Sequence, residues 1–159
     1  MVCLQCTTKR YTKRPSVCPV CNGVMTRVDG RLHKVVESLN HSDFRIAFAT
    51  CETYNNSSMC TAEIIIGFAS AYDDFVFTDL PEHFTYISDR HPSCQYTLNY
   101  LLNHTGYPMA MVMYDYCNHP DRSEPVTKVL QGAIGELYSW SKELKNTAPW
   151  SVGKLAGYI

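Results

Sequence analysis

Four cysteines near the start of the chain form two pairs, each with two residues between its members. Cys3 and Cys6 make the first pair, Cys18 and Cys21 make the second, and eleven residues separate the pairs. Two intervening residues let one tight turn aim two thiolates at a single tetrahedral ion, with Zn–S distances of about 2.3 Å. Four sulfurs leave no open coordination position, which is typical of structural rather than catalytic zinc. The spacing therefore predicts one structural Zn²⁺ held by these four cysteines.

The first 30 residues resemble the zinc ribbon family, in which two rubredoxin-type knuckles hold one metal. The second knuckle, over residues 18–23, reads CPVCNG and is similar to the CPxCxG pattern of that family. The resemblance implies a small antiparallel hairpin clipped by zinc, with strands expected over 8–14 and 24–28. Cys3 lies so near the start that the strand before the first knuckle is expected to be minimal. Zinc ribbons serve nucleic-acid machinery, enzyme subunits and scaffolds, so the resemblance leaves function open.

The segment between the two cysteine pairs is rich in cations and carries one tyrosine. Its candidate nucleic-acid-binding residues are Lys9, Arg10, Tyr11, Lys13 and Arg14. Cations neutralise phosphates, and tyrosine can stack on an unpaired base. The alternative is a solvated hairpin face or a face that docks on protein. Residues 1–34 carry seven Lys/Arg against one Asp, a net of +6, whereas residues 35–159 carry seven against fourteen Asp/Glu, a net of −7. A basic module joined to an acidic body indicates charged partners.

A second metal site is a further hypothesis. His91 and Cys94 lie at the start of an expected helix, and Cys117 and His119 follow an expected strand. Two nitrogens and two sulfurs would suit zinc if these two segments met. The alternative is that both cysteines are small core residues and that both histidines lie in loops.

Length and composition indicate an ordered globular protein. The chain has 159 residues, of which 45% are apolar and 18% are charged. No apolar run approaches the roughly 18 residues of a membrane span, and the polar, cysteine-rich start is unlike a signal peptide. We therefore expect a cytoplasmic protein without membrane contact, in a reducing compartment that favours metal binding over disulfides.

The predicted organisation is a zinc ribbon over residues 1–30 and an α+β domain over residues 31–159, with a turn at 29–30 between them. Four apolar residues with helical spacing predict a helix over 31–40: Leu32, Val35, Val36 and Leu39. The rest of the pattern predicts strands near 44–53, 61–69, 75–78, 83–87 and 109–116, and helices near 92–105 and 124–145. Together these elements predict a mainly antiparallel sheet packed with about three helices. Gly132 and Gly135 weaken the last helix by about 1 kcal/mol each, so we expect close backbone packing there.

The chain contains neither a Gly-rich phosphate loop nor a GxSxG motif. Carboxylates in the expected turns would suit Mg²⁺ in a metal-dependent hydrolase, although acidic residues are ordinary in turns. These carboxylates are Asp73, Asp74, Asp79, Glu82 and Asp89. Eleven tyrosines are typical of a surface that is both apolar and wet, as at protein interfaces, and equally of strands.

The sequence thus predicts a non-catalytic, zinc-binding regulatory protein that contacts nucleic acid or a nucleoprotein complex through a basic zinc ribbon. The alternative is a protein–protein interaction module or inhibitor, such as a viral product directed at its host. This alternative uses a Tyr-rich acidic face, and zinc is then purely structural. A metal-dependent hydrolase is the third interpretation.

Overall fold

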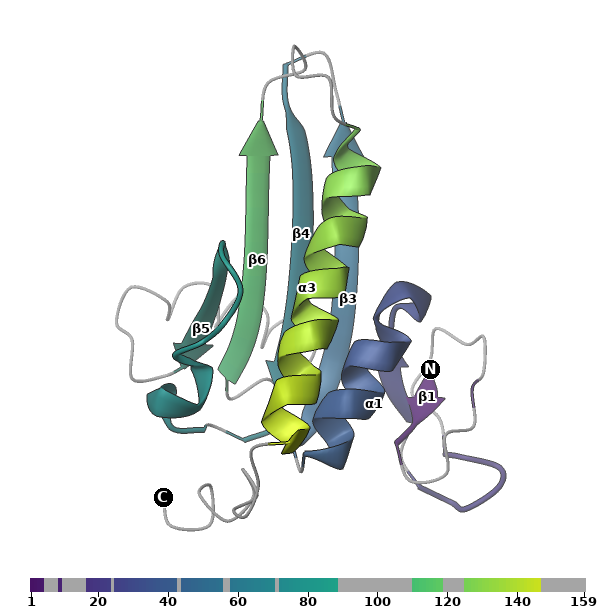
Figure 1. Cartoon of the computed structure of the whole chain (residues 1–159). Helices are drawn as coiled ribbons and strands as arrows, with labels where there is room; N and C mark the ends of the chain where they lie inside the picture. The colour runs from purple at the N-terminus through teal and green to yellow at the C-terminus, as the bar shows by residue number, and fades with distance from the viewer. Residues whose placement is uncertain are drawn as a thin grey trace.

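The computed structural model describes residues 1–4, 9, 17–23, 25–42, 44–55, 58–70, 72–88, 110–118 and 125–146. Within these residues, six strands form one sheet in the order β1-β2-β3-β4-β6-β5 (Figure 1). The strands are β1 (Val2–Cys3), β2 (Met25–Val28), β3 (Ile46–Asn55), β4 (Cys60–Phe68), β5 (Phe84–Ser88) and β6 (Ala110–Asn118). Strands β2 and β3 pair in parallel, and the other neighbours pair antiparallel. The fold is therefore α+β with a mixed, mainly antiparallel sheet.

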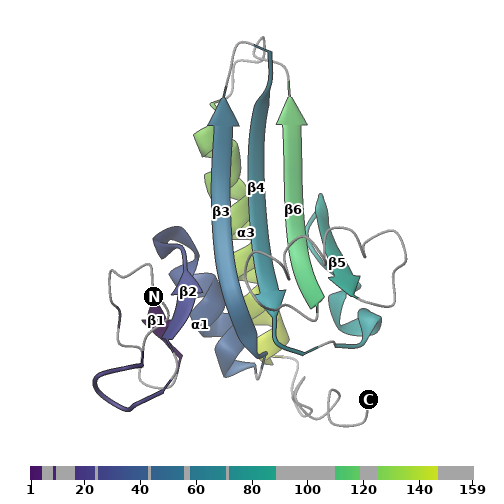
Figure 2. The same ribbon diagram turned by 180° about the vertical axis from the view of Figure 1, so that it is seen from behind.

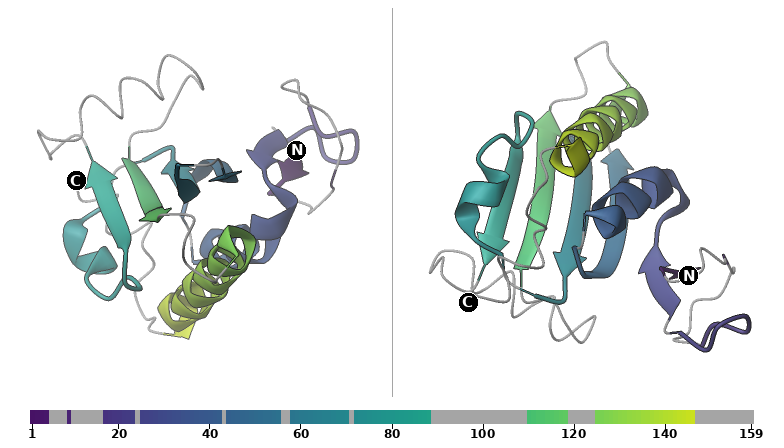
Figure 3. Two further views of the ribbon diagram at one scale, coloured as in Figure 1. Left: turned by 90° about the horizontal axis from the view of Figure 1, so that it is seen from above. Right: turned by 60° about the horizontal axis from the view of Figure 1, so that its bottom comes forward.

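Both α-helices lie on one face of this sheet, as the views in Figures 1 and 3 agree. They are α1 (His33–His41), which follows the short 3₁₀ helix η1 (Gly30–Leu32), and the long helix α3 (Val126–Asn146). The described residues thus contain two α-helices rather than the expected three, and the segment 92–105 expected to be helical lies outside them. Figure 2 shows the opposite face, where β3, β4 and β6 run side by side. In the described part of the chain, no helix is long and apolar enough to cross a membrane.

The helix predicted over 31–40 is confirmed as η1 and α1. All four apolar residues that predicted it are at most 1% exposed and join the main core: Leu32, Val35, Val36 and Leu39. The core continues beneath α3, where Leu130 and Leu137 are equally buried against the sheet. Helical periodicity therefore identified the surface that both helices bury.

The two glycines of α3 differ from expectation. Gly132 and Gly135 are exposed, and a Cβ added at either position would meet no atom within 4 Å. The expectation that close backbone packing explains them is therefore wrong, because nothing in the described structure approaches them.

A β-bulge in β3 sends Ile46 and Phe48 to opposite faces of the sheet. The register shifts between Ile46 and Phe48, so Ile46 lies under the helices while Phe48 packs on the other face with Ile65. On that face Phe48 lies over Gly67, where an added Cβ would come within 2.3 Å of the ring. Gly67 is thus the residue that makes room for the displaced ring.

The segment 75–78, predicted as a strand, is instead part of the 3₁₀ helix η2 (Asp74–Phe77). The Asp73 carboxylate caps this turn by accepting a hydrogen bond from the Phe75 backbone N–H at 3.3 Å. A helical turn buries the consecutive residues Val76 and Phe77, whereas a strand would place them on opposite faces. Phe77 stacks on Tyr86 with ring centroids 3.8 Å apart. The local cap therefore overrides the β propensity of the segment.

Three carboxylates form a row across the sheet face opposite the helices. Glu52 pairs with Glu63 across β3 and β4, and Glu63 pairs with Asp115 across β4 and β6. All three residues are exposed. Neighbouring side chains still desolvate part of the Glu63 carboxyl, which raises its pKa, and the adjacent charges of Asp115 and Glu52 raise this pKa further. We refer to Glu52, Glu63 and Asp115 as the acidic row.

Replacing Glu63 by glutamine should stabilise the protein at neutral pH. A carboxyl whose pKa is raised by folding binds its proton more tightly in the native state, so native stability falls as pH rises through that pKa. Like charges directly opposite each other destabilise a sheet by about 0.2–1 kcal/mol, which is the gain expected at pH 7 for Glu63→Gln. The gain should vanish below about pH 4, where the wild-type carboxyl is protonated in both states. Urea unfolding at pH 4 and pH 7 measures it, with the exposed Glu82→Gln as a control. A gain that does not change with pH would contradict the electrostatic explanation.

Candidate metal centre

Three cysteine sulfurs meet at the edge of the sheet formed by β1 and β2. The Sγ atoms of Cys3, Cys18 and Cys21 all lie within 4.8 Å of one another. The sulfurs of Cys3 and Cys21 are 3.4 Å apart, too long for a disulfide bond of about 2.0 Å. Tetrahedral thiolates at about 2.3 Å from zinc would be roughly 3.8 Å from each other. The described sulfurs are therefore close enough to bind one metal ion, and their softness suits zinc.

Strand pairing and a helix side chain position Cys3. Cys3 lies opposite Met25 in the antiparallel pair of β1 and β2, and its side chain is fully buried against Cys18 and Met25. The next residue, Leu4, is held by the side chain of Asn40 on α1, whose Nδ2 donates to the Leu4 carbonyl at 3.0 Å. Cys3 and Leu4, the two residues of the first cysteine turn that the structure describes, are thus tied to the body.

A tight turn places Cys18 and Cys21 on the same side. The Cys18 backbone N–H donates to the Gly23 carbonyl at 2.7 Å, and the Asn22 N–H donates back to the Cys18 carbonyl at 2.9 Å. Asn22 closes the turn with a left-handed φ of 59°, a conformation that asparagine tolerates better than most residues. The turn buries Cys18 and leaves Cys21 exposed.

An ion pair anchors the strand that carries this site to the rest of the sheet. Arg31 donates from Nε and Nη2 to the two oxygens of Asp29, each at 3.0 Å, and Nη2 also donates to the Cys51 carbonyl of β3 at 2.9 Å. These hydrogen bonds from Arg31 hold the pKa of Asp29 below its usual value. The Asp29 backbone N–H adds a bond to the Ala49 carbonyl at 2.9 Å. The end of β2 is therefore fixed to β3 by charge-assisted bonds.

Among the described residues, Cys3, Cys18 and Cys21 form the one cluster that could hold a metal. The fourth predicted ligand, Cys6, lies outside the described residues. So do His91, Cys94 and His119 of the second predicted site. Its remaining member, Cys117, is exposed at the end of β6 opposite Thr61. Burial raises the pKa of Cys51 to about 12, so that thiol stays protonated at neutral pH.

Of the predicted nucleic-acid contacts, the structure describes Lys9. Its backbone forms an antiparallel bridge with Val2, and its Nζ lies 4.0 Å from the Glu37 carboxylate of α1. Burial lowers the pKa of His33, one turn before Glu37, and the charge of Lys9 lowers it further. The other four predicted contacts lie outside the described residues: Arg10, Tyr11, Lys13 and Arg14.

The carboxylates considered for a hydrolase are separated in the described structure. Asp73 caps η2, Glu82 lies 3.8 Å from His83, and Asp79 lies on the turn that follows η2. Within the described ranges they form no cluster close enough for a metal. Asp89 lies outside those ranges.

The tyrosines divide between the core and the surface. Tyr72, Tyr86 and Tyr114 are buried in the main cluster, whereas Tyr54 is 60% exposed. The Tyr86 hydroxyl bridges the backbone N–H and carbonyl of Tyr72, each at 2.8 Å. Three of the six tyrosines that the structure describes therefore serve packing, and the acidic row is the more prominent feature of the described part of the open sheet face.

Sequence reasoning missed two features of these sites. Asn40, which holds the first cysteine turn, has no local pattern that marks it. The acidic row could have been predicted, because a hairpin that turns between Asn55 and Cys60 brings Glu52 opposite Glu63.

Comparison of the chain with protein-family models, with curated proteins and with solved structures found no match.

Proposed function

We propose that this protein is a non-catalytic, zinc-binding regulatory protein that contacts nucleic acid or a nucleoprotein complex. In this proposal, Cys6 completes a Cys₄ site with Cys3, Cys18 and Cys21. The metal closes the chain into a loop that presents the basic segment 9–14. The observation that carries the proposal is the sulfur cluster, because it brings residues 3 and 18 together at the base of that segment.

Closing the loop matters because a fixed base reduces the conformational entropy lost on binding. The segment between the cysteine pairs carries Lys9, Arg10, Lys13 and Arg14 and no carboxylate. Four cations within six residues give a dense positive charge, which attracts phosphate independently of base sequence. Tyr11 adds one stacking surface for an unpaired base. The zinc is structural in this scheme, since four thiolates leave no site for substrate.

Binding to a single-stranded oligonucleotide tests the proposal. For single strands the salt slope of the binding constant is about −0.7 per phosphate contact, so four contacts predict about 50-fold weaker binding between 50 and 200 mM salt. Replacing Lys9, Arg10, Lys13 and Arg14 by glutamine should abolish this dependence. Fluorescence anisotropy with labelled DNA and RNA strands of equal length measures it.

The matched control replaces four exposed cations elsewhere by glutamine: Lys34, Arg45, Lys128 and Lys142. This control should keep most of the affinity at 50 mM salt. If both variants with four replaced cations lost the same affinity for the oligonucleotide, binding would depend on net charge alone, and the proposal would be wrong. Absence of binding by the zinc-loaded wild type at 50 mM salt would also refute it.

The acidic row favours a second candidate, a protein–protein interaction module whose partner is basic. Three carboxylates from adjacent strands share one exposed face, and the flanking rows hold neither Lys nor Arg: Thr50, Ile65 and Met113 on one side, Tyr54, Thr61 and Cys117 on the other. If this candidate is correct, the Glu52→Gln/Asp115→Asn variant should no longer bind the basic partner protein. The variant with all four cations of the segment 9–14 replaced should still bind that partner.

A further inference from the structure

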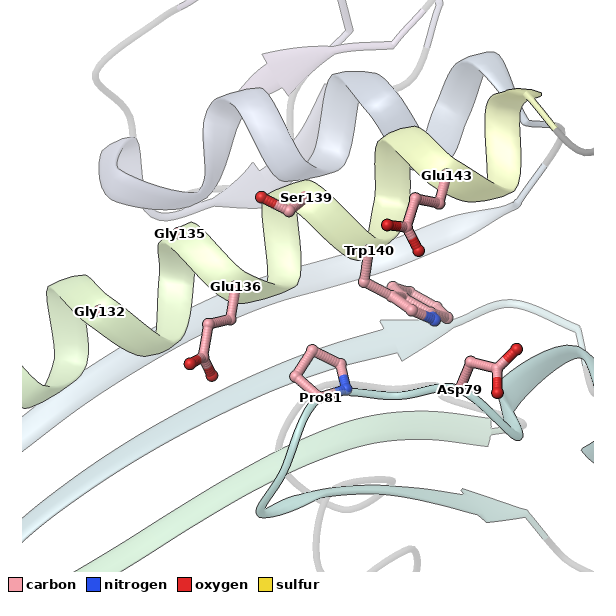
Figure 4. Close-up of a pocket in the computed structure, with 8 residues that line it drawn as sticks. All are labelled: Asp79, Pro81, Gly132, Gly135, Glu136, Ser139, Trp140 and Glu143. Carbon is pink, nitrogen blue, oxygen red and sulfur yellow. The ribbon is translucent and has the colours of Figure 1, made fainter.

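An open pocket lies between α3 and the turn that joins η2 to β5. It has a volume of about 500 Å³, within the range of clefts that hold small ligands. Figure 4 shows Asp79 and Pro81 on the turn, facing Glu136, Trp140 and Glu143 on the helix. The pocket is separate from the sulfur cluster and from the acidic row, and none of the functions above uses it.

The helical wall of this pocket is lined by Gly132 and Gly135. A Cβ at either residue would meet nothing within 4 Å, so the missing side chains serve no packing within the described chain. Glycine on a surface lets another backbone approach a helix closely. The two glycines therefore leave room for a ligand that lies along α3.

Three carboxylates surround the pocket: Asp79, Glu136 and Glu143. Within the described residues, none of the three forms a hydrogen bond or an ion pair with the chain. Lys142, the neighbour of Glu143 in sequence, lies 4.6 Å above the ring of Tyr138 instead. The pocket thus carries three negative charges that the described part of the protein does not neutralise.

The indole N–H of Trp140 adds a hydrogen-bond donor to the pocket. Trp140 is 4% exposed and stacks near Phe77, with ring centroids 6.0 Å apart. Figure 4 shows its ring nitrogen turned toward the turn that carries Asp79. Within the described residues no hydrogen bond involves this N–H, and its nitrogen keeps contact with solvent, because Ser38 Oγ is the one buried side-chain atom there without a partner. The pocket therefore offers one hydrogen-bond donor beside three carboxylates.

We propose that this pocket binds a basic, extended peptide segment of a partner protein. An arginine or lysine side chain pairs with the carboxylates, and a backbone carbonyl of the same segment accepts from the Trp140 N–H. The flat surface over Gly132 and Gly135 accommodates the peptide backbone, and Pro81 and Trp140 contact the apolar stem of the basic side chain.

Other ligand classes match fewer of these features. Nucleic acid and other anions are repelled by the three carboxylates, and a bare metal ion makes no use of the indole N–H or of the open surface over the glycines. A peptide residue with a cationic side chain carries both complementary groups on one unit. This inference stands whether or not the basic segment 9–14 binds nucleic acid.

The probe is a capped heptapeptide in which arginine alternates with glycine. Titration into the ¹⁵N-labelled, zinc-loaded protein should shift the indole N–H resonance of Trp140. The Trp150→Phe variant removes the other indole of the chain. The Glu136→Gln/Glu143→Gln variant should weaken binding at least tenfold. The Gly132→Ala/Gly135→Ala variant should also weaken it while raising the midpoint of thermal unfolding, so its loss of binding cannot be ascribed to misfolding.

The matched control, Glu52→Gln/Glu63→Gln, removes the same charge from the opposite face and should bind the peptide as the wild type does. If this control lost as much peptide affinity as Glu136→Gln/Glu143→Gln does, the binding site would lie on the acidic row, and the proposal would be wrong. Binding without a shift of the Trp140 resonance would overturn it too. Concentration-dependent dimers that disappear in Glu136→Gln/Glu143→Gln would assign the pocket to a second copy of this chain, again against the proposal.

Discussion

Replacing Cys18 by serine should release the metal and lower the stability of the protein by at least about 3 kcal/mol. Metal-binding free energy at a structural site is folding free energy, because the unfolded chain has no preformed site. For a chain of this size, 3 kcal/mol corresponds to a fall in Tm of about 6–12 °C. Cys18 is fully buried beside Cys3 and Met25, so its loss also disrupts packing under β1. Mass spectrometry of metal content and thermal unfolding measure the two effects.

Chelation of the wild type should reproduce the fall in Tm, which separates loss of metal from loss of the thiol. Cys117→Ser is the matched control, because Cys117 is exposed and lies at the far end of β6. The control should keep one zinc per chain. Two zinc ions in the wild type and one in this control would instead establish the second site predicted around Cys94 and Cys117. A wild type without zinc would refute the metal centre.

Replacing Phe44 by alanine should destabilise the protein by about 3–5 kcal/mol, the range for a fully buried phenylalanine. Phe44 is 1% exposed and lies within an aromatic cluster beside the helices. Its ring centroid is 5.4 Å from Phe68, 4.9 Å from Tyr72 and 5.8 Å from Phe77. Truncation leaves a cavity lined by three rings, which cannot close without moving β4 and η2. Urea unfolding followed by circular dichroism measures the loss.

Zinc content should remain at one per chain in the Phe44→Ala variant, since the aromatic cluster and the sulfur cluster share no residue. The exposed Tyr54→Ala variant should lose less than about 1 kcal/mol. A loss below 1 kcal/mol for Phe44→Ala as well would mean that the cluster does not support the fold as described.

Apolar patterns predicted elements that form the core. The strands ending near Phe68 and Tyr116 could be identified because each is a nearly continuous apolar run, which is typical of strands buried on both faces. The helix beginning at Leu32 could be identified because its apolar residues repeat at helical spacing. Such patterns depend only on the local chain, so one sequence is enough to recognise them.

Features that depend on tertiary contacts could not be predicted from the sequence. The bulge before Phe48 is recognisable only once Gly67 is known to lie opposite, and η2 depends on one capping bond from Asp73. The parallel pairing of β2 with β3 could not be predicted either, because the sequence pattern of a hairpin does not indicate which further strand of the sheet lies beside it.

For the candidate site, spacing identified Cys3, Cys18 and Cys21, which the structure brings together. The pocket beside Trp140 was missed. Gly132 and Gly135 were expected to pack closely against another part of the chain, whereas the space beside them is open.

The Arg31 contact with β3 has a consequence for strand addition. Within the described residues β3 pairs with β2 only at Phe48 and Ala49, so beyond these two residues no described strand covers its outer side. Backbone groups on that side alternate, and the Ala49 and Cys51 carbonyls already accept bonds from Asp29 and Arg31. A charged guanidinium at this point occupies the carbonyl that an incoming strand would pair with first. The same ion pair that fixes β2 thus also obstructs growth of the sheet along β3, and so opposes aggregation through that edge.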